Sequence, residues 1–214
     1  MRMFIQDDGA PRALVLLPGA QMHPADVQRA GLPRQLAESG VTLDLYVPNL
    51  HLDPTGRFDA LQHLEAEVLA PLRARYAELW LGGISLGGLL ALLYAQRRPQ
   101  GLRGLCLLSP YAGSRLTTNA IQRAGGLDAW QPTPRQLDDG EFTLWHGLRQ
   151  GQPDVPAFIG WGLADRFAGA MADVAQRLPQ AHAVQVPQGH DWTAWLPLWS
   201  LFLHRLDAAG EGSG

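Results

Sequence analysis

The feature that most constrains the fold is a regular alternation along the chain. Short apolar runs with strand character are separated by longer segments with helical spacing. Because the runs are short and apolar, they resemble strands buried on both faces, as in a parallel sheet that helices cover. The sequence therefore predicts an α/β fold with a mostly parallel, doubly wound sheet of about six to seven strands and helices on both faces. The predicted strands span residues 13–18, 41–48, 78–83, 102–110, 155–162 and 182–187, with 3–6 as an additional edge strand.

The segments between these strands carry the helical pattern. Apolar side chains at positions 58, 61, 64, 68, 69 and 72 form a stripe along one face of a predicted helix. The predicted helices span residues 25–39, 58–77, 86–98, 167–178 and 192–209.

The length of 214 residues fits one domain, and no internal repeat or linker divides the chain. We expect a single domain over residues 1–207 and a disordered tail over 208–214. Residues 111–154 break the alternation, because about 44 residues separate two strands that one helix would ordinarily join. We expect short helices there, forming either a surface excursion or a lid beside a functional site.

Charge and composition exclude several classes of function. The net charge is −3 and no basic cluster stands out, which argues against a nucleic-acid partner. All 17 basic residues are arginine, so no lysine can form a Schiff base or bind phosphate in a P-loop. No Cys/His cluster has zinc-ligand spacing and no G-x-G-x-x-G is present, so we expect no metal and no organic cofactor.

The cysteine content and the N-terminus indicate where such a chain works. The one cysteine, Cys106, lies in an apolar predicted strand, so an internal disulfide is impossible and a buried core position is expected. The N-terminal residues lack the apolar region of a signal peptide, and no apolar run reaches the roughly 18 residues of a membrane span. We therefore expect a cytoplasmic protein without a membrane span.

One serine lies in a glycine-rich connection between a predicted strand and a predicted helix. Residues 83–87 read Gly-Ile-Ser-Leu-Gly, which matches G-x-S-x-G in its required strand–turn–helix context. Glycines two residues to either side leave room for Ser85 in a strained turn. The turn also places the hydroxyl at the carboxyl edge of the sheet and at a helix N-terminus. Ser85 is therefore the candidate nucleophile.

A serine nucleophile needs a base, and the expected chain order is serine, acid, histidine. Asp165 follows the predicted strand 155–162, and His190 follows the predicted strand 182–187. Because the carboxyl ends of parallel strands meet at one edge of the sheet, we expect both side chains to lie near Ser85. Alone, Asp165 could be a helix cap and His190 a loop residue, but all three in this order predict a catalytic triad.

Other acids and histidines fit these roles less well. Asp154 precedes its predicted strand and His182 begins its own, so both should lie at the opposite edge of the sheet. Asp191 is adjacent to His190 and is better suited to cap the helix that follows. His204 lies deep in the last predicted helix, and His51 and His63 are expected at the surface.

The oxyanion of an acyl-transfer reaction needs two backbone N–H donors. Leu86, which follows the candidate nucleophile, should supply one of them. The second should come from the loop after the first core strand, where Pro18 has no N–H and Gly19 makes the turn. Ala20 is therefore the preferred second donor and Gln21 the next candidate.

Aromatic residues near these positions suggest an apolar pocket, although large aromatics usually serve core packing. His23 lies in the first loop, and a surface position is preferred for it over a pocket position. Aromatics of the last helix, at positions 192, 195, 199 and 202, are more simply a buried stripe. The candidate pocket residues are Gln21, His23, Leu50, Tyr111, Trp130, Trp145, Trp161 and Trp192.

The segments LPGA, GISLGG, GLADRF and GHDW, in this order, resemble the α/β-hydrolase superfamily over nearly the whole chain. The compact length resembles its small carboxylesterase and thioesterase (lysophospholipase-like) branch. Two features depart from that pattern: Pro18-Gly19 stands where the family commonly has His-Gly, and residues 111–154 are longer than the compact branch implies.

The resemblance implies the α/β-hydrolase fold and a serine hydrolase that cleaves a small-molecule ester or thioester through an acyl-enzyme. The motifs place the family's nucleophile on Ser85, its acid on Asp165, its base on His190, and its oxyanion donors on Ala20 and Leu86. Two alternatives stay open: a triad enzyme of different chemistry (C–C hydrolase, peptidase or acyltransferase), or a catalytically silent binding module. The acyl group, the leaving group and the oligomeric state are not readable from the sequence.

Overall fold

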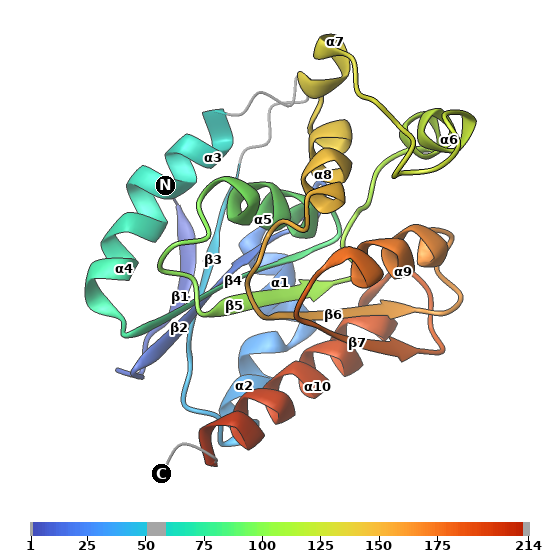
Figure 1. The fold of residues 1–214 in the computed structure, drawn as a ribbon. Helices are drawn as coiled ribbons and strands as arrows, with labels where there is room; N and C mark the ends of the chain where they lie inside the picture. Colours follow the sequence, from blue (N-terminus) through green and yellow to red (C-terminus); the bar gives the residue numbers. More distant parts are fainter. Residues whose placement is uncertain (1, 51–58, 212–214) are drawn as a thin grey trace.

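The structure, a computed structural model, describes residues 2–50 and 59–211 (Figure 1). Its centre is a sheet of seven strands in the order β1-β3-β2-β4-β5-β6-β7. All neighbouring strands are parallel except β1, which pairs antiparallel with β3 at one edge. The predicted α/β class and mostly parallel sheet are therefore confirmed. The strands are β1 (Met3–Gln6), β2 (Arg12–Leu17), β3 (Asp44–Pro48), β4 (Glu78–Ile84), β5 (Gly104–Leu108), β6 (Ala157–Gly162) and β7 (Ala181–Val186).

Helices cover both faces of this sheet (Figure 1). Alternate residues of β2, β4, β5 and β6 point into two separate apolar clusters, one on each face. One cluster includes α3 (Asp59–Leu64), α4 (Ala70–Arg75), α5 (Leu86–Arg97) and α9 (Ala168–Arg177). The opposite cluster includes α1 (Pro24–Ala30), α2 (Leu32–Ser39) and α10 (Trp192–Glu211).

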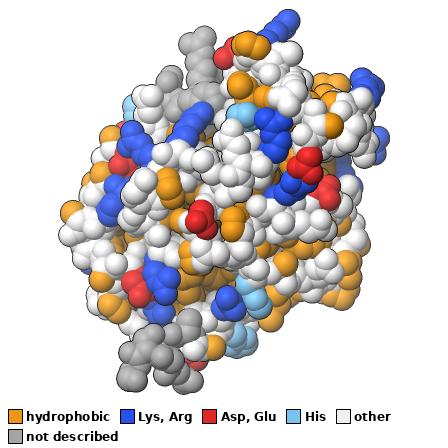
Figure 2. All heavy atoms as spheres, in the orientation of Figure 1, with side chains coloured by type: hydrophobic (Ala, Val, Ile, Leu, Met, Phe, Trp, Pro, Cys, Tyr) orange, Lys and Arg blue, Asp and Glu red, His pale blue; other side chains and the backbone are white. Residues whose placement is uncertain are grey.

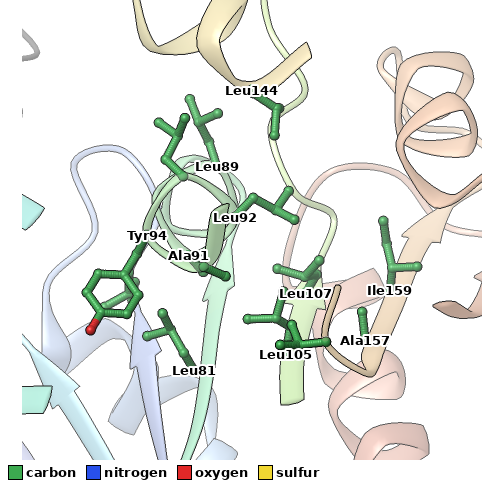
Figure 3. Close-up of a cluster of buried hydrophobic side chains, with 14 of the residues drawn as sticks. Leu81, Leu89, Ala91, Leu92, Tyr94, Leu105, Leu107, Leu144, Ala157 and Ile159 are labelled. Atoms are coloured by element: carbon green, nitrogen blue, oxygen red, sulfur yellow. The ribbon is translucent and has the colours of Figure 1, made fainter. Parts of the chain in front are cut away.

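Helix α5 is the central helix of the first cluster, and Figure 3 shows its apolar side chains against the sheet. Leu92 faces Leu107 of β5. Leu144, from the helix Gly140–Arg149, belongs to the same apolar cluster. Because α5 is apolar around most of its circumference, it is buried between the sheet and the helices of residues 111–154.

Two predicted helices are interrupted in the structure. The segment 25–39 forms two helices, because Gly31 adopts a left-handed conformation (φ 97°) that ends α1 and begins α2. In the segment 58–77, a π-helical turn at Glu65–Leu69 joins α3 to α4. Phe58, the first apolar residue of that predicted stripe, lies outside the described residues.

The long segment 111–154 contains three helices: α6 (Arg115–Arg123), α7 (Pro134–Leu137) and α8 (Gly140–Arg149). Of these, α8 packs on α5 and contacts α9, with Leu144, Trp145 and Leu148 buried. At the other end of the chain, α10 extends to Glu211, so residues 208–211 are helical where the sequence predicts a disordered tail.

The surface is mixed in character. Figure 2 shows basic and acidic side chains interspersed among apolar and neutral ones on the face seen in Figure 1. Within the described part of the chain, none of the helices combines the length and the apolar character that crossing a membrane requires.

A close backbone contact sets the distance between the end of β6 and the loop after β7. A Cβ added at Gly162 would lie 2.0 Å from the carbonyl oxygen of Gln188. Two hydrogen bonds hold the same approach, from Leu163 N to Val186 O (2.7 Å) and from Ala164 N to Gln188 O (3.1 Å). The position therefore accepts only glycine without a backbone shift.

We expect Gly162→Ala to lower the free energy of unfolding by about 1–3 kcal/mol, the usual cost of overpacking a fitted contact. Urea unfolding followed by circular dichroism measures this change. Gly169→Ala, in α9, is the matched control, because an added Cβ there meets no atom within 4 Å. We expect the control to gain about 0.5–1 kcal/mol from helix propensity. Equal stability of Gly162→Ala and the wild type would contradict the close contact.

Candidate active site

Ser85 lies in the turn between β4 and α5 with φ 52° and ψ −115°, in the positive-φ region that side chains rarely occupy. The surrounding backbone holds this conformation through hydrogen bonds. Ser85 N donates to Leu108 O (3.0 Å), and Ser85 O accepts from Tyr111 N (2.8 Å) and Gly88 N (2.9 Å). The turn therefore presents the hydroxyl at the carboxyl edge of the sheet, where the sequence predicts it.

The glycines around Ser85 are required by close backbone contacts. A Cβ at Gly83 would lie 2.1 Å from the carbonyl carbon of Gly87, and a Cβ at Gly87 would lie 2.1 Å from Leu17 O. A Cβ at Gly88 would meet Pro110 Cβ at 2.7 Å. These glycines let α5 begin directly against β2 and β4, which brings its N-terminal turn to the sheet edge.

The structure brings Ser85, His190 and Asp165 into one chain of hydrogen bonds. His190 Nε2 lies 2.9 Å from Ser85 Oγ, and His190 Nδ1 lies 2.5 Å from Asp165 Oδ2. Phe167 N donates to the other carboxylate oxygen of Asp165 at 2.8 Å. The Asp165 side chain is fully buried, whereas that of His190 is 23% exposed. The buried Asp165 carboxylate therefore orients the imidazole through Nδ1, and the partly exposed imidazole contacts Ser85 through Nε2.

The rival acids and the cysteine lie in other surroundings. Asp191 accepts hydrogen bonds from Thr193 N (2.8 Å) and from the Thr193 hydroxyl at the start of α10, and these bonds hold its pKa below the ordinary value. Asp154 accepts from Gln180 Nε2 just before β7. Cys106 is fully buried inside β5, where burial raises the pKa of its thiol. None of these groups contacts Ser85 Oγ in the structure.

Two aromatic rings hold the imidazole of His190 edge to face. The centroid of the Phe167 ring lies 5.7 Å from that of His190, and the centroid of Trp195 lies 5.4 Å away. The interplanar angles are 77° and 85°, which is the favourable T-shaped arrangement. Trp192 packs on Trp195 in the same manner, at 5.1 Å. The imidazole of His190 is thus oriented by aromatic contacts as well as by Asp165.

Ser85 and His190 open onto a cavity of about 390 Å³. Ala20 and Leu86, the expected oxyanion donors, both line it. Leu86 begins α5, and the first N–H groups of a helix have no partner within that helix. The remaining lining residues are Gly19, Met22, Tyr111, Arg166, Phe167 and Trp195.

Of the candidate pocket residues, the structure places Tyr111 on the cavity and the others elsewhere. Trp161 and Trp130 are buried in the core, and Trp145 is buried with its Nε1 donating to Ala112 O at 2.7 Å. Trp192 reaches the site only through Trp195. His23 is exposed at the N-cap of α1, Gln21 is exposed in the turn before it, and Leu50 packs against the core. The cavity wall therefore differs from the one that the sequence predicts at every one of these positions except Tyr111.

Met22, Arg166, Phe167 and Trp195 are lining residues that the sequence pattern did not identify. Arg166 and Phe167 directly follow Asp165, and this position beside the predicted acid is a signal by which the sequence could have identified them as lining residues. The spacing of aromatics in α10 predicts that Trp195 belongs to a buried stripe, whereas its position in the first turn, five residues after His190, brings it to the cavity.

Tyr111 joins the cavity to the segment 111–154 through Glu141. The Tyr111 hydroxyl donates to Glu141 Oε1 (3.1 Å), and Glu141 Oε2 accepts from Ser114 N (2.7 Å) and from the Thr117 hydroxyl (2.6 Å). Burial raises the pKa of Tyr111 to about 12, aided by the Glu141 carboxylate. Burial also opposes ionisation of Glu141, but the bonds from Thr117, Ser114 and Tyr111 outweigh it and lower its pKa.

No protein-family model matches this sequence, and no curated protein matches it at a significant level. Solved structures share its fold. A hormone-sensitive lipase from a metagenome library superposes with a TM-score of 0.68 at 18% identity, covering 94% of this chain and 79% of that one. A predicted CIB-like hydrolase from Thermoplasma acidophilum gives 0.61 at 16% identity, covering 97% and 92%.

Est1E from Butyrivibrio proteoclasticus, in a structure with ferulic acid bound, gives a TM-score of 0.64 at 14% identity, covering 99% of this chain and 94% of that one. At such identities the likeness establishes the fold alone. The chain therefore has the α/β-hydrolase fold, as the resemblance of its motifs implies. Among residues 2–50 and 59–211, no group of three or more His, Cys, Asp or Glu side chains could hold a metal ion.

The lowered pKa of Glu141 gives its anchoring role a pH dependence with a definite sign. A carboxylate whose pKa is lower in the folded state stabilises the fold above its unfolded pKa and loses that contribution as pH falls through the folded pKa. We expect Glu141→Gln to lower the free energy of unfolding at pH 7 by about 1–3 kcal/mol, because three donors lose their charged acceptor. This advantage should shrink as pH falls below the ordinary value of 4.5 towards the lower pKa of the folded state, so the gap should be smaller at pH 3 than at pH 7.

Urea unfolding at both pH values measures the difference between the wild type and Glu141→Gln. Glu38→Gln is the control, because Glu38 is exposed and its nearest cation, Arg34, lies 3.9 Å away. A gap between wild type and Glu141→Gln that is the same at pH 7 and pH 3 would refute the role of the charge.

Proposed function

We propose that this protein is a serine hydrolase that cleaves a carboxylic ester or thioester of a small molecule through an acyl-enzyme intermediate. The observation that carries the proposal is the hydrogen-bonded chain Ser85–His190–Asp165, which ends with its serine on an open cavity. This chain supports the proposal, because acyl transfer requires a nucleophile, a base and an orienting acid within hydrogen-bond reach of one another.

In the first half of the reaction, Ser85 Oγ attacks the substrate carbonyl carbon while His190 Nε2 accepts the hydroxyl proton. Asp165 holds the imidazole in the tautomer that leaves Nε2 free, and its negative charge stabilises the imidazolium that forms. The Ala20 and Leu86 N–H groups stabilise the oxyanion of the tetrahedral intermediate. His190 then returns the proton to the leaving alkoxide or thiolate as the bond to it breaks.

In the second half, water attacks the acyl-enzyme and His190 accepts its proton. The second tetrahedral intermediate collapses, the carboxylic acid leaves, and the same proton returns to Ser85. The aromatic contacts of Phe167 and Trp195 support both halves, because they keep the imidazole at the angle that serves Ser85.

The likeness to solved structures supports an ester-cleaving activity over other chemistry. The structures named above are described as a lipase, a hydrolase and Est1E with ferulic acid bound, and a further structure with this fold is described as a ferulic acid esterase. A protein described as an S-formylglutathione hydrolase from Staphylococcus aureus shares the fold as well, with a TM-score of 0.65. Because S-formylglutathione is a thioester, this likeness supports the thioester as well as the ester alternative.

We expect Ser85→Ala to reduce kcat/KM for 4-nitrophenyl butyrate by roughly four orders of magnitude, because the nucleophile is lost. His190→Gln should fall comparably, and Asp165→Asn should lose activity through the wrong imidazole tautomer. Absorbance of released 4-nitrophenolate measures the rate, and butyryl thioesters with a thiol reagent measure the thioester branch. A fluorophosphonate probe should label the wild type and not Ser85→Ala.

Ser109→Ala is the matched control. Ser109 is a buried serine at the end of the neighbouring strand and also has a positive φ (46°), but it does not line the cavity. This variant should keep wild-type activity and labelling. Full activity of Ser85→Ala would overturn the assignment of the nucleophile. A wild type that neither hydrolyses the panel nor takes up the probe would favour a binding module with this fold.

A further inference from the structure

The cavity beside Ser85 carries a cation that the proposed reaction does not use. Arg166 is the one arginine among the described residues that line the cavity. Its backbone position is fixed by the turn that holds Asp165, because Phe167 N and Ala168 N donate to the Asp165 side chain (2.8 Å) and carbonyl oxygen (3.0 Å). The same turn that buries the Asp165 carboxylate therefore places the backbone of Arg166 beside the cavity that its side chain lines.

The guanidinium of Arg166 rests on an aromatic ring and makes no ion pair with another described residue. Its Cζ lies 4.6 Å from the centroid of Phe167, the ring that also contacts His190. Stacking on an aromatic face holds the planar group and leaves its N–H donors at the edge available. One aromatic ring thus connects the cation to the proposed base.

The nearby carboxylates are bound to other groups, and none of those in the described part of the chain forms an ion pair with Arg166. Both oxygens of Glu141 are occupied by Tyr111, Ser114 and Thr117. Asp139 accepts from Glu141 N (2.8 Å) at the start of α8, and Asp165 is bound to His190 and Phe167. The guanidinium of Arg166 therefore keeps N–H donors that a group entering the cavity can bind.

We propose that Arg166 is a specificity residue that binds a carboxylate of the substrate, so that the preferred substrates are esters or thioesters that carry a second, free carboxylate. This inference rests on the proposed function. A guanidinium presents two parallel N–H donors that match the two oxygens of a carboxylate. A single positive charge balances a monoanion, whereas a phosphate dianion would call for a second cation, which the lining residues do not include.

Two matched probe pairs test this preference without assuming which side of the scissile bond carries the carboxylate. The acyl pair is mono-4-nitrophenyl adipate and its methyl ester, and the leaving-group pair is 4-acetoxyphenylacetate and its methyl ester. We expect the wild type to prefer the carboxylate member of one pair by about fivefold in kcat/KM, mainly through KM, because exposed ion pairs are weak. Added salt should reduce the preference.

Arg166→Gln should abolish the preference while hydrolysis of the methyl esters continues, and Arg166→Lys should keep part of it. Arg123→Gln is the control, because Arg123 is exposed on α6 and does not line the cavity. Hydrolysis of the methyl esters without a preference in either pair, or a preference that survives in Arg166→Gln, would overturn the inference and leave the proposed function standing. If the wild type hydrolyses none of the four probes, the proposed function fails and the inference falls with it.

Discussion

The site depends on one strained residue, Ser85, whose backbone is held at φ 52°. A non-glycine residue in such a conformation costs on the order of 1–3 kcal/mol, which the surrounding structure must supply. Here hydrogen bonds to both the N–H and the carbonyl oxygen of Ser85 offset this cost. The Ser85 N–H is bound to the end of β5, and its carbonyl oxygen accepts from the start of α5 and from Tyr111. Because these partners belong to the sheet and to the most buried helix, the serine cannot relax without moving the core.

The parallel sheet explains why residues far apart in sequence meet at this serine. Every parallel strand ends at the same edge, so the residues that follow β4, β6 and β7 converge there. The short glycine-mediated contacts make that convergence precise. The end of β6 lies against the loop after β7 at Gly162, and this contact places Asp165 within hydrogen-bond distance of His190. Strand order brings the side chains together, and backbone contact sets their final spacing.

The strands and their mostly parallel arrangement can be predicted from the sequence, whereas side-chain packing cannot. Local apolar runs predict the strands, and one turn motif then predicts that Ser85, Asp165 and His190 meet, although their catalytic role stays a prediction. The breaks in two predicted helices depend on backbone details that apolar spacing does not encode. The residues of the pocket wall are harder to predict. Trp145 and Trp195 are both buried aromatic residues, and the sequence pattern does not tell which of them lines the cavity. Packing alone turns the first indole inward to a core carbonyl and lays the second against the imidazole.

Consecutive residues show how one turn can serve both chemistry and recognition. After β6 the chain buries the Asp165 carboxylate completely and leaves Arg166 exposed at the cavity. Opposite charges in such proximity would ordinarily pair, but Asp165 is already saturated by His190 and by the Phe167 N–H. The Phe167 ring contacts both neighbours of the turn. The His190 imidazole packs against this ring edge to face, and the Arg166 guanidinium lies over it. The Asp165 carboxylate is thus buried behind His190, and of the two charged side chains only the cationic Arg166 lines the cavity.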